Sequence, residues 1–273
     1  MSKQLRNKSY TTKNVKRNDK NVGKDRMNIQ SKRMVWWGVA IIAFVFFVLL
    51  QVPASWMIAK FYQNNQILKN VSGNFWRGQA DWQSGNVRGS VAWKNRPLDF
   101  LLLRWGVDLE VHSGPTQLHG VASYGVGKTL HLKDWSGQIS ADSLKQIMPG
   151  QWPSNAIQIS ALQFKFKATQ GFSQADGQVQ WGGGGLGYQF AGHTEHMDIP
   201  SLQGQFTDQQ DQLLLSLQDQ RSQKLASLVL DRNLMLDVQL TQRLLLNVAS
   251  YTGKAGLDSY VLSSRQPLLS GGR

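Results

Sequence analysis

Gly127-Lys128-Thr129 and the glycine-rich run 182–187 are the segments most similar to a phosphate-binding loop. Such a loop needs a further glycine five positions before Gly127, and a helix after the threonine that points backbone N–H groups at the phosphate. Ala122 occupies the first position, and Leu130 begins a segment with strand-like alternation. The run 182–187 has no Lys-Ser/Thr pair and opens no apolar helix. We therefore predict turns at both places and no nucleotide site.

His193-Thr-Glu-His196 is the one cluster whose residue types suit a metal site. Zinc needs three or four converging ligands, and helical ligand pairs are usually four residues apart. Histidines three apart on a strand point to opposite faces, and the sequence offers no obvious third ligand nearby. We interpret the cluster as a polar loop and expect neither a metal nor a cofactor.

The residues of a catalytic site are present only as scattered ingredients. Serine, histidine and aspartate occur, but the Gly-x-Ser-x-Gly nucleophile elbow does not. Carboxylates such as Asp208, Asp211 and Asp219 lie among glutamines, where nothing separates the pKa values of two of them. The absence of cysteine excludes a disulfide framework and a cysteine nucleophile. We predict that the chain is not an enzyme, with a hydrolase as the weakest alternative.

The formal net charge of +13 is concentrated at the N-terminus. Residues 1–33 hold 11 Lys and Arg against Asp19 and Asp25, whereas the remaining 240 residues hold 19 basic and 15 acidic groups. This tail has too little apolar surface to offset its ordering entropy, so we expect a disordered cytoplasmic segment. Binding of anionic headgroups or nucleic acid is the alternative to a topology signal. We favour the topology signal and expect no nucleic-acid partner.

Residues 34–59 contain no charged side chain and predict a single transmembrane helix. A helix that crosses the bilayer core takes about 20 mainly apolar residues. Tryptophans stand near both ends of this segment, as they do in interfacial aromatic belts. The residues that mark this predicted anchor are Met34, Trp36, Trp37, Leu50 and Trp56.

A cleaved signal peptide is the competing interpretation of the same segment. The small residues at 52–54 could suit a peptidase, but the apolar run exceeds the roughly 7–15 residues of a signal h-region. We therefore favour an uncleaved anchor. The basic tail predicts that the N-terminus is cytoplasmic and that residues 63–273 are exported.

Beyond the anchor, apolar and polar residues alternate, which predicts strands with one buried face. The clearest of these segments are 87–94, 107–112, 156–168 and 234–241. The apolar positions switch parity within 156–168, so we predict a β-bulge near Ala161. Capping residues and a Pro-Gly stop predict a short helix at 140–148, and a second is expected near 241–249.

Three short patterns recur in the same order at nearly one offset, which indicates an internal repeat. The matched pairs are 89–93 with 177–181, 118–120 with 202–204, and 130–134 with 215–219. We predict two related antiparallel β modules, about 68–150 and 155–240. The expected fold is mainly β: one N-terminal transmembrane helix, then a twisted antiparallel sheet with one or two short helices.

Two motifs carry a resemblance to a known family. Val52-Pro53-Ala54-Ser55-Trp56 ends the predicted anchor, and Gly73-Asn-Phe-Trp76-Arg-Gly78 opens the exported part. With 132–137 leading into 141–144, the chain resembles the N subunit of the type II (general) secretion pathway over about residues 34–270. The 33-residue tail departs from that family, whose cytoplasmic segment is short.

The resemblance implies a non-enzymatic component of the bacterial inner membrane that supports export of folded periplasmic proteins. Its partners would be other secretion subunits of the inner-membrane platform or periplasm and the membrane, without a small-molecule substrate. Pro53, Gly73, Trp76 and Gly78 would form a structural motif. A second hypothesis comes from the residues themselves: a curved sheet with one apolar face could hold acyl chains, as in a lipid-handling or envelope-assembly protein.

Overall fold

The structure, a computed structural model, is described here for part of the chain, which divides into two units, residues 1–51 and 52–273. The described residues are 36–45, 47–48, 51–61, 67–85, 87–147, 151–190, 193–248 and 251–268. The basic tail and the predicted anchor residues Met34 and Leu50 lie outside them.

In the first unit, residues 36–45 and 47–48 are helical, and Trp36 and Trp37 are exposed. Among the helices of the described residues, none is both long enough and apolar enough to cross a bilayer.

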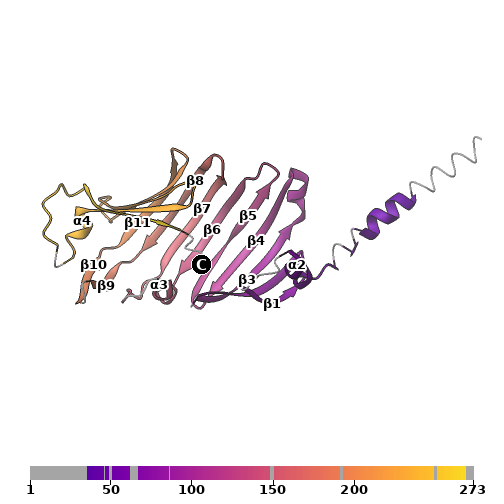
Figure 1. Cartoon of the computed structure of the whole chain (residues 1–273), viewed down its shortest axis with the longest axis horizontal. Helices are drawn as coiled ribbons and strands as arrows, with labels where there is room; N and C mark the ends of the chain where they lie inside the picture. The colour runs from indigo at the N-terminus through magenta and orange to yellow at the C-terminus, as the bar shows by residue number, and fades with distance from the viewer. Residues whose placement is uncertain are drawn as a thin grey trace, which may run out of the picture. The chain divides into compact units, whose positions relative to one another are not determined.

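A single antiparallel sheet of thirteen strands dominates the second unit (Figure 1). Its first eight strands, in chain order, are β1 (Leu68–Gly73), β2 (Arg77–Ser84), β3 (Val87–Arg96), β4 (Arg104–Ser113), β5 (Thr116–Gly125), β6 (Leu130–Ile139), β7 (Ile157–Lys167) and β8 (Gly171–Trp181). The other five are β11 (Leu202–Gln209), β12 (Gln212–Gln218), β13 (Lys224–Leu230), β14 (Met235–Thr241) and β15 (Tyr260–Pro267). Neighbours in the sheet follow chain order, except that β8 pairs with β11. The predicted mainly antiparallel β fold with few helices is confirmed.

A separate hairpin and short helices complete this unit. The hairpin pairs β9 (Gly184–Phe190) with β10 (His193–Ile199). The helices are α2 (Ala54–Phe61), α3 (Ala141–Ile147), α4 (Gln242–Leu245) and the 3-10 helix η1 (Pro97–Leu102). Helices are present at both expected places, within 140–148 and 241–249, and Thr241 caps α4 because its side chain accepts the Leu244 N–H.

The bulge predicted near Ala161 is also present. The register of β7 against β8 shifts between Ser160 and Gln163, and Ala161 has φ of 52°. This extra residue allows both apolar halves of β7 to lie on one face of the sheet.

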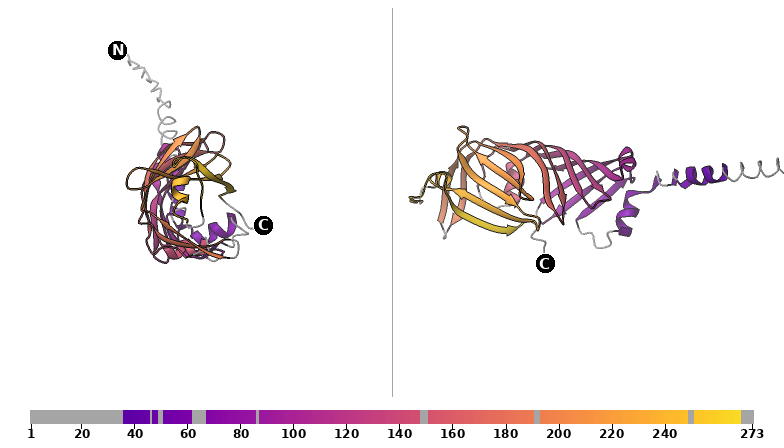
Figure 2. Two further views of the ribbon diagram at one scale, coloured as in Figure 1. Left: turned by 90° about the vertical axis from the view of Figure 1, so that its left-hand side faces the viewer. Right: turned by 90° about the horizontal axis from the view of Figure 1, so that it is seen from above.

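The sheet curls so that α2 and α4 lie on its inner side (Figure 2). A cluster of buried apolar residues lies between α4 and β13. Leu244 of α4 packs with Leu225 and Ala226 of β13, and partly buried leucines surround them. The surrounding leucines are Leu202, Leu217 and Leu240.

The two predicted modules take different pairings within this sheet. β3 and β5, which carry two of the repeated patterns, are separated by β4, whereas their counterparts β8 and β11 pair directly. The β9–β10 hairpin stands outside the large sheet at the point that corresponds to β4. A common origin of the modules stays a prediction.

The junction between the two units falls inside the predicted anchor. Val52 O accepts a hydrogen bond from Phe75 N–H at 3.0 Å, and Pro53 forms a β-bridge with Asn74. These contacts tie residues 52–53 to the turn after β1. Trp56, which we assigned to the anchor, therefore lies on α2 in the second unit, where its side chain is 60% exposed.

Candidate functional site

An apolar hollow of about 290 Å³ lies where α2 meets the inner face of the sheet. Alternation along β3 and β4 places apolar residues opposite one another, as in the pairs Val91–Val111 and Trp93–Leu109. The hollow is lined by Ala54, Leu68, Phe75, Val91, Trp93, Asn95, Trp105, Val107 and Leu109. Its lining is almost wholly apolar, so it can take hydrocarbon or an apolar side chain but offers little to a polar ligand.

Asn95 is the polar residue at the centre of this hollow, and it is buried. Its side-chain amide donates to Phe75 O, and its Oδ1 accepts from Trp105 Nε1 at 2.8 Å. Its own N–H donates to Trp76 O at 2.7 Å. Burial of an amide is tolerated when its groups are hydrogen-bonded. Asn95 therefore joins the turn after β1 to β4.

Four aromatic rings pack around the same turn. Phe75 stacks on Trp105 with centroids 5.9 Å apart, and Trp76 meets Phe75 edge-on at 5.2 Å. Trp76 also meets Phe100 of η1 edge-on at 6.0 Å. Offset and edge-on packing of this kind stabilises beyond simple burial. The turn and η1 thus form one supported unit at this edge of the sheet.

The two glycines of the motif have distinct steric roles. Gly73 has φ of 88°, a region that favours glycine, and a Cβ there would overlap the Arg77 carbonyl. A Cβ on Gly78 would overlap the indole of Trp93. The structure thus brings Pro53, Gly73, Trp76 and Gly78 to one place beside the apolar hollow. That they act as a family motif stays a prediction.

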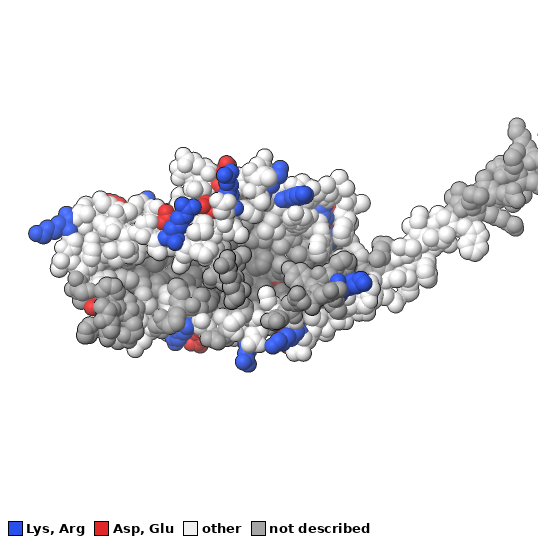
Figure 3. All heavy atoms as spheres, in the orientation of Figure 1, with Lys and Arg blue, Asp and Glu red and all other residues white. Residues whose placement is uncertain are grey.

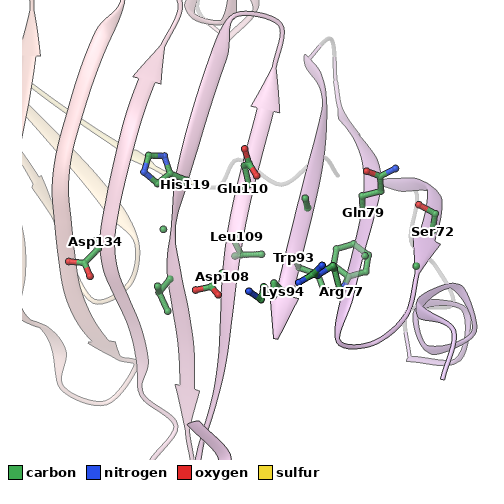
Figure 4. Close-up of a pocket in the computed structure, with 15 residues that line it drawn as sticks. Ser72, Arg77, Gln79, Trp93, Lys94, Asp108, Leu109, Glu110, His119 and Asp134 are labelled. Carbon is green, nitrogen blue, oxygen red and sulfur yellow. The ribbon is translucent and has the colours of Figure 1, made fainter. Parts of the chain in front are cut away.

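A second hollow, of about 800 Å³, opens on the opposite face of β2–β6 (Figure 4). Polar and charged side chains from neighbouring strands line it, because the residues that alternate with the apolar set are polar. They include Arg77, Lys94, Asp108, Glu110, His119 and Asp134. Glu110 lies 3.0 Å from His112 Nε2, and Asp108 lies 3.6 Å from Arg96. Exposed pairs like these contribute little to stability and suit a hydrated surface.

Metal-binding geometry is not found in the part of the chain that the structure describes: it contains no group of three His, Asp or Glu residues that could hold an ion. His196 is exposed on β10, while the side chain of His193 lies outside the description. Gly127–Thr129 form the turn between β5 and β6, where Lys128 N–H donates to Gly125 O at 2.9 Å. A strand follows this turn, as the sequence predicted.

Two turns at one edge of the sheet expose large apolar side chains, and we call them the apolar turns. They are residues 97–103, between β3 and β4, and residues 126–129, between β5 and β6. Val126 N–H donates to Leu103 O at 3.2 Å, which holds the two turns together. Their exposed apolar residues are Leu98, Phe100, Leu101, Leu102, Leu103 and Val126. Exposed apolar clusters of this kind mark interaction sites on soluble domains.

A basic group adjoins the apolar turns on the outer face of the sheet. Arg104, His131 and Lys165 line a hollow of about 370 Å³ there. Burial lowers the pKa of His131 first, and the positive charges of Lys165 and Arg104 lower it further. His131 therefore stays neutral near pH 7, and the charge of this group comes from Arg104 and Lys165. Figure 3 shows Lys and Arg as separate groups on the face in view, some of them beside Asp or Glu.

Sequence reasoning missed Asn95 and the apolar turns. The signal for the turns is visible in retrospect: Leu98 and three consecutive leucines at 101–103 stand between two alternating segments. A connection between strands is normally polar, so an apolar run at this position is unusual. Asn95 gives no comparable signal, because its partners come from elements that only the fold brings together.

Comparison with known proteins gives one match. A family model described as "Type II secretion system (T2SS), protein N" matches residues 65–248. No curated protein and no solved structure was found to match the chain. The matched region begins just before β1 and ends after α4, so it includes every strand of the sheet except β15. The chain belongs to the family of type II secretion system protein N.

Proposed function

We propose that this protein is a non-enzymatic component of the type II secretion machinery, anchored in the inner membrane with its β domain in the periplasm. Family membership supports a role in type II secretion and a place in the cell envelope. The match to the sheet region, residues 65–248, is the single observation that carries the proposal. The uncharged stretch 34–59 behind a basic tail supports the anchor and the cytoplasmic N-terminus.

Contact with other secretion subunits would use the surfaces that the sheet leaves available. β15 is the last strand of the thirteen, and most of its residues are exposed. An edge strand can accept an extended segment of a partner through main-chain hydrogen bonds. β1, at the other end of the sheet, is short and bulged and contacts α2, so it is the less suitable edge. We therefore place partner docking at β15, with a subunit of the inner-membrane platform or periplasm as its occupant.

A deletion strain tests the proposed role. Loss of the protein should reduce release of secreted enzymes into the medium while the same enzymes accumulate in the periplasm. The full chain should restore release, and so should a chain without residues 2–30 that keeps Lys32 and Arg33, if the tail is only a topology signal. Normal release in the deletion strain would contradict the role.

A reporter fusion tests the topology separately. Alkaline phosphatase fused after Arg273 should be active in cells, because the enzyme folds only after export. Removal of residues 34–50 from the same fusion is the control and should abolish activity. An inactive fusion to the full chain, or a mature N-terminus at Ser55, would contradict the anchored arrangement.

The inner face of the sheet favours lipid handling as a second candidate function. That face is apolar over successive strands, and among the described residues α2 and α4 cover parts of it (Figure 2). The apolar hollow beside α2 could receive part of an acyl chain. Mass spectrometry of the full chain purified from membranes, with a delipidation step, would detect retained lipid. Normal secretion in the deletion strain, together with altered outer-membrane lipid composition, would favour this candidate over the first.

A further inference from the structure

We propose that the apolar turns insert into the headgroup region of a phospholipid bilayer, where the basic side chains beside them contact anionic lipid. The proposal goes beyond a role in secretion, because it assigns a membrane contact to the β domain itself. It rests on the proposed anchor only for the identity of the membrane.

The apolar turns form an exposed tip at the edge of the sheet. Leu98, Leu101 and Val126 expose 75%, 81% and 79% of their surface. They come from two turns that a main-chain hydrogen bond joins, so they form one patch rather than isolated contacts. Trp76 packs edge-on against Phe100 of this patch, and Phe75 links Trp76 to Trp105. A supported apolar tip is suited to shallow insertion into a bilayer.

Two aromatic residues lie next to the apolar turns, where the membrane–water interface would be if the turns insert into a bilayer. Trp105 and Tyr124 lie directly opposite each other on β4 and β5, immediately behind the turns, and each is nearly half exposed. Their rings have an apolar body and a polar edge, which favours the boundary between acyl chains and headgroups. They occupy the next layer after the leucines.

Charge complementarity favours a lipid surface as the occupant. Lys128 lies within the second turn, and Arg104 begins β4 directly after the first. Lys165 adds a third positive charge on the outer face next to Arg104. Asp99 is the acidic residue within the turns, and Arg96 lies 3.5 Å from it. Basic residues at a membrane surface gain from the negative potential of anionic lipids.

The N-terminal end of the β unit lies at the same edge of the sheet as the apolar turns. Val52, the first residue of the β unit, hydrogen-bonds to Phe75, whose ring stacks on Trp105. The uncharged stretch that we propose as the anchor, residues 34–59, continues through Val52 into α2. Residues 52–53 therefore join the β unit at the edge that carries the apolar turns.

Depth-dependent quenching tests the proposal on the full chain. The protein contains no cysteine, so single cysteines can be labelled with bimane without background. Leu101→Cys reports on the apolar turns, and Thr169→Cys in the exposed β7–β8 turn at the same edge is the matched control. Val39→Cys reports on the proposed anchor. The chain would be reconstituted in vesicles of phosphatidylethanolamine and phosphatidylglycerol that contain lipid with a nitroxide at the headgroup or at the mid-chain.

The expected result is strong quenching at position 101 by the headgroup nitroxide and weak quenching at 169. Leu98→Ser with Leu102→Ser should abolish the signal at 101. Arg104→Gln with Lys128→Gln should weaken it, as should replacement of phosphatidylglycerol by phosphatidylcholine. Circular dichroism would establish that these variants keep the sheet.

Each contrary outcome has a distinct meaning. Quenching at 39 without quenching at 101 would overturn the inference while leaving the anchor intact. Absence of quenching at 39 by the mid-chain nitroxide, with strong quenching at 101, would overturn the anchor and retain the inference. Protection of the label at 101 only when membrane proteins are added would show that the occupant is a protein, and would also overturn the inference.

Discussion

The turns at one edge of the sheet fall into two chemically different sets. The apolar turns connect β3 to β4 and β5 to β6, whereas the connections further along the same edge are polar. We call the second set the polar turns: residues 168–170, 210–211 and 231–234. In the polar set, Asp231 Oδ1 accepts the N–H groups of Asn233 and Met235, and the neighbouring Asp208 accepts the N–H of Ala175. In the apolar set, main-chain groups bond mainly to one another.

This difference distinguishes side chains that stabilise the turns from side chains that are exposed on the surface. The polar turns show that strands at this edge can be connected by turns that polar side chains stabilise. Asp231, for example, accepts hydrogen bonds from main-chain N–H groups of its own turn. Leaving a leucine in water forfeits about 1.5–3 kcal/mol of the free energy that burial would provide. The polar turns close the same edge without such leucines, so the exposed leucines at 98 and 101–103 support the membrane contact proposed above.

Trp76→Ala should produce the largest loss, because it removes the support of the apolar turns. Truncation of a packed Phe or Trp costs about 3–5 kcal/mol, and the partly exposed Trp76 belongs near the lower value. Urea unfolding of the purified chain would measure this, and abundance in cells should fall in parallel. Trp56→Ala on α2 is the control, and a surface change of this kind stays within about 0.5 kcal/mol. An equal loss of unfolding free energy in the two variants would contradict a specific supporting role of Trp76.

Asn95→Leu should cause the next largest loss in the free energy of unfolding, about 1–3 kcal/mol. The substitution leaves the Phe75 carbonyl and the Trp105 Nε1–H without their partner. Asn233→Leu, in a polar turn and exposed, is the matched control. Its free energy of unfolding should remain close to that of the original chain. A cost at Asn233 as large as that at Asn95 would show that both sets of turns depend on buried amides.

Asp231→Asn should show an effect that depends on pH. Hydrogen bonds from the main chain of Met235 lower the pKa of Asp231 most, with further lowering from Asn233 N–H and Arg265. Since the folded-state pKa is below the unfolded value of about 3.9, the ionised carboxylate stabilises the fold above that pH. This stabilisation is lost as the pH falls through the folded-state pKa.

The measurement is urea unfolding of both chains between pH 7 and pH 2. Asp231→Asn should be the less stable at neutral pH, and the gap should close in acid. Asp258→Asn is a control, because Asp258 pairs with Arg243 on a different part of the unit. A difference in unfolding free energy that stays constant with pH would mean that the charge of Asp231 does not stabilise the polar turn.

The sequence predicted most of the strands because period-two alternation depends on local residue order alone. β3, β4, β7 and β14 cover the four segments named, and parity even located the bulge at Ala161. The pairing of β8 with β11 could not be read in the same way. Alternation says which face a strand buries, but it does not say which strand lies beside it.

The site was less predictable than the fold for a related reason. Gly73 and Gly78 stand out in the sequence, and their close contacts follow from glycine's lack of a side chain. Asn95 looks like any polar residue until Phe75 and Trp105, twenty positions before it and ten after, are brought to it. The tie between Val52 and Phe75 gives no sequence signal either, because it is a main-chain hydrogen bond.

The smallest effect on stability is expected at the tip of the apolar turns. Leu101→Ser changes a side chain that is 81% exposed, so the free energy of unfolding in detergent should change by no more than about 0.5 kcal/mol. Thr169→Ser in a polar turn is the control and should behave alike. The two should differ only when lipid vesicles are present, because the leucine alone loses apolar contact with the bilayer. A loss of several kcal/mol without lipid would mean that Leu101 serves the fold, and the two sets of turns would then differ in composition but not in purpose.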